Sequence, residues 1–217
     1  MPNARAHSQL YLVLETDGHG TGLEHLEAAL TVAGEAVACV LLKPRPGGSL
    51  GHGELPTAIQ RLQARGLAVL VAGDAETALH LGADGVHLGV CEDEADARSR
   101  YAIARAALGS ARTVGASAGL SRHLAMVLGE IGADYVAFEP DASGQSREGA
   151  AEQAQWWVPL FEVPVVVLGV ESAAEADRLA AAGVEFVGVD LSDSDAEAQA
   201  RHVARMAEAL SVGETGR

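Results

Sequence analysis

The sequence repeats one pattern three times, in which a glycine ends a helix-like stretch and an acidic residue and a short apolar strand follow. The copies occupy residues 81–86, 131–136 and 182–187, with their glycines at Gly82, Gly132 and Gly183. A glycine just past a helix adopts the left-handed conformation at little steric cost. An interval of this length accommodates two strand–helix units, so the repeat predicts a closed (β/α)8 TIM barrel. In such a barrel the chemistry lies in the loops after the carboxyl ends of the strands.

Eight short apolar segments alternate with eight helical segments along the chain. Strands are expected at residues 10–14, 36–42, 67–72, 85–88, 113–116, 135–138, 163–168 and 186–189. Helices are expected at 23–32, 54–65, 75–81, 94–108, 121–131, 150–157, 172–182 and 194–210. Continuous apolar runs are typical of parallel strands that are buried on both faces. The chain is therefore expected to form an N-terminal extension at 1–8, one barrel domain at 9–210 and a flexible tail at 211–217.

The composition limits the kind of partner that the chain can bind. Its 217 residues carry a formal net charge of −15, which argues against nucleic acid and anionic membrane surfaces as partners. The two cysteines lack metal-ligand spacing, and no leader-like segment or membrane-length apolar run is present. We therefore expect a cytoplasmic protein without membrane association, and the sequence leaves its oligomeric state open, a homo-oligomer included.

Two cations follow the second predicted strand, in an otherwise acidic protein. Lys43 comes directly after the strand, and Arg45 lies two residues later in a loop rich in proline and glycine. Cations at the mouth of a barrel predict an anionic ligand. A solvated pair of cations in a turn is the equally weighted alternative.

The segment after the fourth predicted strand carries several carboxylates, beginning at Glu92. Carboxylates in such a loop could hold Mg²⁺ together with a substrate phosphate. The favoured alternative is that they form the acidic first turn of the next helix, where the helix dipole stabilises them. His87, inside the apolar strand, is more typical of a hydrogen-bonded core histidine than of a catalyst.

The later loops supply small and hydroxyl-bearing residues. Ser117 follows the fifth strand, and the long sixth loop, residues 139–148, could fold over a ligand. Backbone amides in the last two strand–helix loops of a barrel frequently form a phosphate site. The candidate residues there are Gly169, Leu191 and Ser192. The sequence therefore predicts a site that acts on a phosphorylated small molecule.

Five segments carry a resemblance to a known family. They are QLYLVLETD at 9–17, LGADGVHLG at 81–89, TVGASA at 113–118, GADYVAFEP at 132–140 and PVVVLGV at 164–170. With these segments the chain resembles the thiamine-phosphate synthase family and its thiazole-tautomerase relatives. The resemblance implies a Mg²⁺-dependent transferase that joins an aminopyrimidine pyrophosphate to a thiazole phosphate and releases pyrophosphate. In the family mechanism, departure of pyrophosphate leaves a pyrimidine cation, which the thiazole nitrogen captures.

The resemblance also implies a set of site residues. Lys43, Ser117 and Arg147 take catalytic positions, and Asp74 and Glu92 take the positions of the metal carboxylates. The phosphate-binding positions fall on Ser146, Gly169, Leu191 and Ser192. The chain departs from the family at the second strand, where Leu41 and Leu42 stand near the family's glutamine and arginine, and after the third strand, where Ala72 and Gly73 replace Asn-Asp.

Because of these departures, three functions stay open at this point. The first is a working synthase that uses substitute residues. The second is a catalytically degenerate relative that binds a phosphorylated or thiamine-related ligand in a non-enzymatic or regulatory role. The third is another reaction on a related phosphate ester, such as an isomerisation.

Overall fold

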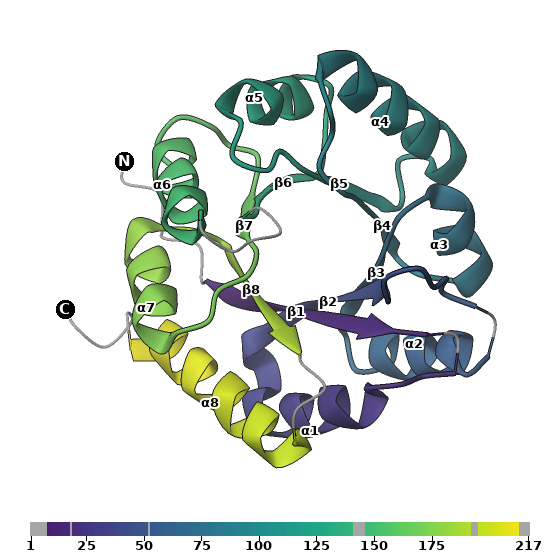
Figure 1. Ribbon diagram of the computed structural model, residues 1–217, viewed down its shortest axis with the longest axis vertical. Coiled ribbons are helices and arrows are strands. Elements are labelled where there is room, and N and C mark those ends of the chain that lie inside the picture. The colour runs from purple at the N-terminus through teal and green to yellow at the C-terminus, as the bar shows by residue number, and fades with distance from the viewer. Residues whose placement is uncertain (1–7, 18, 52, 141–145, 192–194, 213–217) are drawn as a thin grey trace.

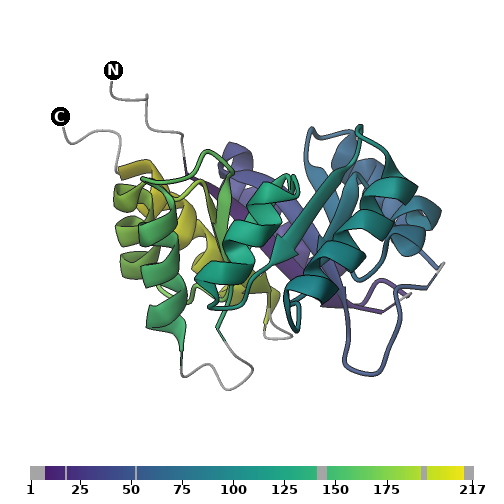
Figure 2. The same ribbon diagram turned by 90° about the horizontal axis from the view of Figure 1, so that it is seen from above.

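The apolar segments of the sequence pair side by side until the last one closes on the first. The protein is seen here in a computed structural model that describes residues 8–17, 19–51, 53–140, 146–191 and 195–212. Its eight parallel strands run in the order β1 to β8, and β1 pairs with β8 to close the barrel. Figure 1 looks into this barrel and shows the helices as a ring outside the strands, and Figure 2 shows the same ring from the side. The predicted (β/α)8 barrel is confirmed.

Strands and helices alternate along the whole described chain. The strands are β1 Gln9–Thr16, β2 Val37–Pro44, β3 Ala68–Ala72, β4 Gly85–Leu88, β5 Thr113–Ser117, β6 Tyr135–Phe138, β7 Val165–Val167 and β8 Phe186–Leu191. The α-helices are α1 Leu23–Ala33, α2 Leu55–Gln63, α3 Ala75–Leu81, α4 Glu94–Leu108, α5 Arg122–Glu130, α6 Arg147–Trp157, α7 Ala173–Ala182 and α8 Ala196–Val212. A short 3₁₀ helix, Gly34–Ala36, precedes β2.

The structure differs from the sequence-based boundaries mainly at the ends of elements. Strands β1 and β2 extend further than expected because their pairing continues through Glu15 with Lys43 and through Thr16 with Pro44. Helix α8 runs to Val212 and so includes the first residues of the predicted tail. Residues 1–7 and 213–217 lie outside the described part of the chain. Among the described residues, no helix combines the length and the apolar character that crossing a membrane requires.

The repeated acidic residues tie neighbouring strands together at the amino-terminal end of the barrel, which we call the floor. Asp84 accepts a hydrogen bond from the backbone N–H of Val69 at 2.8 Å, and Asp134 accepts one from Val114 at 2.7 Å. Glu185 accepts the corresponding bond from the start of β7 at 3.1 Å. In each case the acid before an even-numbered strand caps the preceding odd-numbered strand. This pairing explains why the pattern recurs once every two strand–helix units.

The inside of the barrel is filled by side chains from alternate positions of the strands. Its inner cluster consists of Tyr11, Val13, Cys39, Leu41, Leu70, Tyr135, Ala137, Val166 and Leu168. A larger apolar cluster lies between the strands and the surrounding helices. Successive side chains of a strand face opposite sides, so positions two apart share the barrel interior. Continued towards the carboxyl ends of the strands, this alternation decides which residues face the mouth of the barrel.

Candidate functional site

A cavity of about 260 Å³ opens at the carboxyl ends of the strands, where a barrel of this kind carries its chemistry. It is lined by Val13, Leu41, Lys43, Ala72, His87, Gly89, Glu139, Pro140, Leu168, Gly169 and Asp190. We call it the inner cavity. An outer cavity of about 660 Å³ shares Val13, Lys43 and Asp190 with it. Because the two share these walls, they form one stepped depression at the mouth of the barrel.

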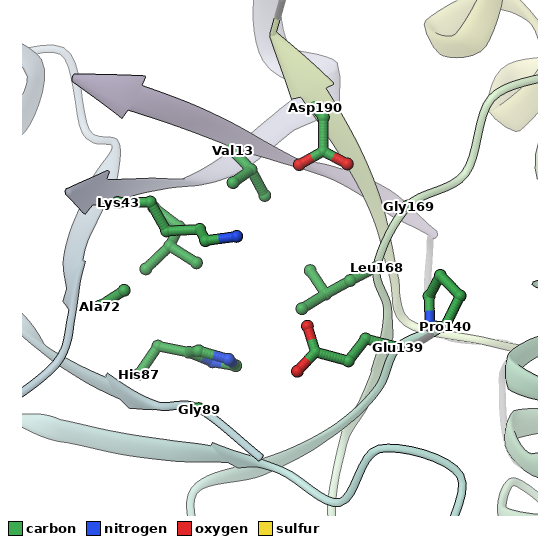
Figure 3. A pocket seen from close by; sticks show the side chains of 11 residues that line it. Val13, Lys43, Ala72, His87, Gly89, Glu139, Pro140, Leu168, Gly169 and Asp190 are labelled. Atoms are coloured by element: carbon green, nitrogen blue, oxygen red, sulfur yellow. The ribbon is translucent and has the colours of Figure 1, made fainter. Parts of the chain in front are cut away.

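Lys43 lies between the inner and the outer cavity, at the end of β2. Strand pairing places it opposite Glu15 of β1, and its Nζ lies 3.6 Å from Oε1 of Glu15. Figure 3 shows its side chain extending into the space above the barrel interior. Arg45 joins Lys43 in the lining of the outer cavity. The structure therefore brings both predicted cations to the mouth of the barrel.

Two carboxylates line the inner cavity together with Lys43. Asp190 lies in β8, and Glu139 directly follows β6. Figure 3 shows both side chains pointing into the cavity. Neither residue was among the site residues predicted from the sequence. Strand alternation could have found Glu139, because Tyr135 and Ala137 of the same segment face the barrel interior.

His87 lies at the wall of the inner cavity and is buried, with 4% of its surface exposed. Its Nδ1 lies 2.8 Å from the hydroxyl of Tyr135. Burial, followed by the positive charges of Lys43 and Arg100, lowers the pKa of the His87 imidazole to about 4. The side chain is therefore neutral at physiological pH. It is a hydrogen-bonded core histidine, as expected, and it also borders the cavity.

Ser117 lies at the end of β5 and is fully buried, outside the residues that line either cavity. Its hydroxyl donates to the carbonyl of Ala137 at 3.5 Å and accepts from the backbone N–H of Gly119 at 3.3 Å. These bonds connect β5 to β6 and to the turn that follows. In this structure the Ser117 side chain therefore hydrogen-bonds to the backbone of neighbouring segments.

The two predicted metal ligands also lie outside the cavity linings. Asp74 is the N-cap of α3 and accepts from the backbone N–H of Thr77 at 2.8 Å and from its hydroxyl at 3.2 Å. Glu92 is exposed in the turn before α4, where its backbone N–H donates to Asp96. Within the described ranges, no group of three or more His, Cys, Asp or Glu side chains could hold a metal ion. Asp74 and Glu92 are thus not brought into the lining of either cavity, and their assignment as Mg²⁺ ligands stays a prediction.

The predicted phosphate-binding residues divide between the cavities and their surroundings. Gly169 lines the inner cavity in a left-handed conformation, with φ +74°, where a Cβ would lie 3.2 Å from Cγ of Pro140. Leu191 lines the outer cavity. Ser146 takes the N-cap position of α6 without a side-chain capping bond and is not part of either lining. Arg147 is the first residue of α6, and Ser192 lies outside the described residues.

Of the residues selected from the sequence, the structure thus gathers Lys43, Arg45, Gly169 and Leu191 around the stepped depression. It adds the three polar side chains His87, Glu139 and Asp190. The result is a small site in which an ammonium group faces two carboxylates beside a neutral imidazole. Such a site can bind an anionic group at its rim and a positively polarised ring deeper inside.

Comparison with known proteins agrees with this architecture and identifies the relatives. A thiamine-phosphate synthase of Erythrobacter litoralis is 32% identical over 189 residues, which cover 84% of this chain and 86% of that protein. The corresponding protein of Rhodospirillum centenum is 36% identical over 167 residues, covering 75% and 77% of the two chains. A solved thiamine phosphate pyrophosphorylase from Pyrococcus furiosus superposes with a TM-score of 0.70 at 20% identity, over 98% of this chain and 100% of that one. At that identity it supports the fold alone.

The family profile for thiamine monophosphate synthase matches residues 10–192, from the first strand of the barrel to the end of the last. That range includes every residue that lines the inner cavity. By sequence and by fold, this chain belongs to the thiamine monophosphate synthase family.

Proposed function

We propose that the protein acts in thiamine biosynthesis as a transferase that joins an aminopyrimidine pyrophosphate to a thiazole phosphate and releases pyrophosphate. The observation that carries the proposal is the distribution of charge in the stepped depression. Two cations, Lys43 and Arg45, line the outer cavity together with the carboxylates Glu15 and Asp190. In the inner cavity Lys43 is the single cation beside Glu139 and Asp190, so positive charge is concentrated towards the outer end. This order matches a substrate with an anionic pyrophosphate at one end and a ring that becomes cationic at the other.

The reaction breaks one bond and forms another. The bond between the pyrimidine-bearing carbon and the pyrophosphate oxygen breaks, and its electron pair leaves with the oxygen. The thiazole nitrogen then donates its lone pair to that carbon, and a carbon–nitrogen bond forms. Cations at the outer cavity stabilise the departing pyrophosphate, and the carboxylates of Glu139 and Asp190 stabilise the cation left behind.

The protein's other contribution is alignment. Gly169 leaves its backbone open to the inner cavity, where backbone groups can approach a phosphate closely. Holding the two rings together in one cavity replaces a collision between two molecules by a step within one complex. Mg²⁺ bound to pyrophosphate would supply further positive charge. Because Asp74 and Glu92 lie outside the linings of both cavities, we assign stabilisation of the leaving group to Lys43 and Arg45.

The test is direct incubation of the purified protein with both substrates, with and without Mg²⁺, while pyrophosphate release is followed. We expect turnover, and we expect it to fall in Glu139→Gln, which keeps the size of the side chain and removes its charge. Absence of turnover by folded protein, together with failure to rescue a thiamine auxotroph, would contradict the proposal.

A second candidate function is ligand binding without catalysis. One observation favours it, namely that two carboxylates and a single ammonium group line the inner cavity, although the substrate carries several negative charges. Calorimetric titration with the thiazole phosphate and with the aminopyrimidine pyrophosphate separates the two candidates. Binding of either compound without turnover would support this second function.

A further inference from the structure

A chain of buried polar side chains crosses the barrel interior beneath the inner cavity. The hydroxyl of Tyr11, in β1, lies 2.9 Å from the hydroxyl of Tyr135, in β6. The same Tyr135 hydroxyl lies 2.8 Å from Nδ1 of His87, in β4. His87 in turn borders the inner cavity. Three strands that are far apart in the sequence thus contribute to one hydrogen-bonded unit.

Packing fixes the geometry of this unit. The rings of Tyr11 and Tyr135 meet edge to face with centroids 6.0 Å apart, and the rings of His87 and Tyr135 are nearly parallel at 5.8 Å. Gly115 makes room for the Tyr135 ring, because a Cβ at that position would overlap the ring atoms. Side chains confined in this way occupy one rotamer. The imidazole is therefore held with Nδ1 towards the tyrosines.

The protonation states of the neighbouring side chains decide which tautomer of His87 this arrangement favours. Burial raises the pKa values of both tyrosines and of the Cys39 thiol beside Tyr11, so all three keep their protons. If each group donates towards the cavity, Cys39 donates to Tyr11, Tyr11 to Tyr135, and Tyr135 to Nδ1 of His87. In either order the sulfur takes part in one weak hydrogen bond, so the difference lies between Tyr135 and His87. There a phenol O–H is a more acidic donor than an imidazole N–H, and an imidazole nitrogen is a more basic acceptor than a phenol oxygen. The first order makes the stronger set of bonds.

We propose that Tyr135, held by Tyr11, is a positioning residue that locks His87 in the neutral tautomer with its proton on Nε2. The Nε2–H then donates to an acceptor atom of the bound ligand, such as a nitrogen of an aminopyrimidine ring. This assignment of the ligand contact rests on the proposed function, whereas the tautomer does not. The charged groups that act on His87 are Lys43, from β2, and Arg100, from α4; Glu139 reaches into the same cavity.

The tautomer is measured by nitrogen NMR of the full-length protein labelled with ¹⁵N-histidine, without ligand. The His87 signals are assigned by their loss in His87→Gln. We expect Nδ1 to resonate as an unprotonated nitrogen and Nε2 as a protonated one, without change between pH 7 and pH 5. A proton on Nδ1, or rapid averaging of the two tautomers in the wild-type protein, would overturn the proposal.

Removal of one hydroxyl tests the positioning role. In Tyr135→Phe we expect the chemical shifts of the two His87 nitrogens to move towards the average of the two tautomers. If Tyr135→Phe does not fold, Tyr11→Phe is the milder variant. The matched control is Tyr101→Phe, which removes a hydroxyl that donates to the carbonyl of Gly132 at a distance from His87. Unchanged His87 shifts in folded Tyr135→Phe would refute the lock.

Kinetics then tests the ligand contact separately. In Tyr135→Phe we expect kcat/KM to fall about tenfold, the size of one lost hydrogen bond. His87→Gln, whose amide still offers an N–H, is expected to retain more activity than His87→Ala. Equal losses in the two His87 variants would overturn the donor role of Nε2–H. If the wild-type protein shows no turnover, the proposed function fails while the NMR result still decides the tautomer.

Discussion

The two ends of the barrel use the same kind of side chain for different purposes. At the floor, Asp84 and Asp134 each accept a hydrogen bond from the backbone N–H of a neighbouring strand. At the mouth, Glu139 and Asp190 point into the cavity (Figure 3). The side-chain chemistry is similar, and the position along the strand decides the role. A carboxylate at the start of a strand holds the barrel together, whereas one at the end lines the cavity.

The difference has a physical origin in the parallel arrangement of the strands. All eight strands start at the floor, so the same hydrogen bond from an acidic side chain to a neighbouring strand can recur there. This recurrence produces the repeat seen in the sequence. The strands also end together at the mouth, but there each strand end and loop lines the cavities with different residues. Carboxylates at the floor should therefore govern stability, and charged groups at the mouth should govern activity.

The largest expected effect lies at the mouth, in Lys43→Ala. Loss of an electrostatic group that stabilises the leaving pyrophosphate should lower kcat/KM by about 10²–10³-fold. The fold should tolerate the change, since Lys43 is half-exposed and its 3.6 Å ion pair with Glu15 is a surface contact of small energetic weight. Steady-state kinetics and thermal unfolding measure the two quantities. The matched control is Arg201→Ala, which removes an exposed cation of α8; an equal loss of activity there would contradict the assignment.

The second prediction concerns His87, which lies between the two ends of the barrel. Its pKa is about 4 in the folded protein and about 6.5 when unfolded, so the unfolded chain binds the proton first as the pH falls. Stability from this group is therefore complete above pH 6.5 and is lost progressively down to about pH 4. The loss in the free energy of unfolding over that window should approach about 3 kcal/mol.

Urea denaturation at pH 7 and near pH 4.5 checks this value by comparing the wild-type protein with His87→Gln. Other acidic groups titrate in both proteins and cancel in the difference. The wild-type protein should lose more stability than the variant. If the free energy of unfolding of both proteins fell equally between the two pH values, the His87 imidazole would be solvated in the folded state.

The sequence predicted the fold well because the signals of the barrel are local and repeated. Each apolar run became a strand, and Gly82 and Gly183 end α3 and α7 in left-handed conformations. The site was harder to predict, because it depends on which side chains from different strands meet. Lys43 was found from its charge, whereas Glu139 gave no such signal and is selected only by the alternation of β6. Asp74 was predicted from a family position, and Glu92 from both its loop and a family position; the structure leaves both outside the cavity linings.

The third prediction tests the floor through Asp134→Ala. The Oδ2 atom of Asp134 accepts from the backbone N–H of Val114 at 2.7 Å and from Nη2 of Arg105 at 2.6 Å. Removal of the carboxylate leaves a partly buried N–H without its acceptor, at a cost of about 2 kcal/mol in the free energy of unfolding. Chemical denaturation measures the loss. The control Glu130→Ala removes an exposed carboxylate and should change stability by less than about 0.5 kcal/mol.

The smallest expected effect comes from Asp74→Ala, and it decides between the cap and the metal roles of this residue. As the N-cap of α3, Asp74 satisfies the backbone N–H of Thr77, so its loss should cost about 1 kcal/mol in the free energy of unfolding. Asp74→Asn, which keeps a capping oxygen, should recover most of that stability. A Mg²⁺ titration of activity provides the second measurement. A cap leaves the Mg²⁺ dependence of both variants like that of the wild-type protein, whereas a metal ligand would shift it in both, because the asparagine loses the charge that Mg²⁺ requires.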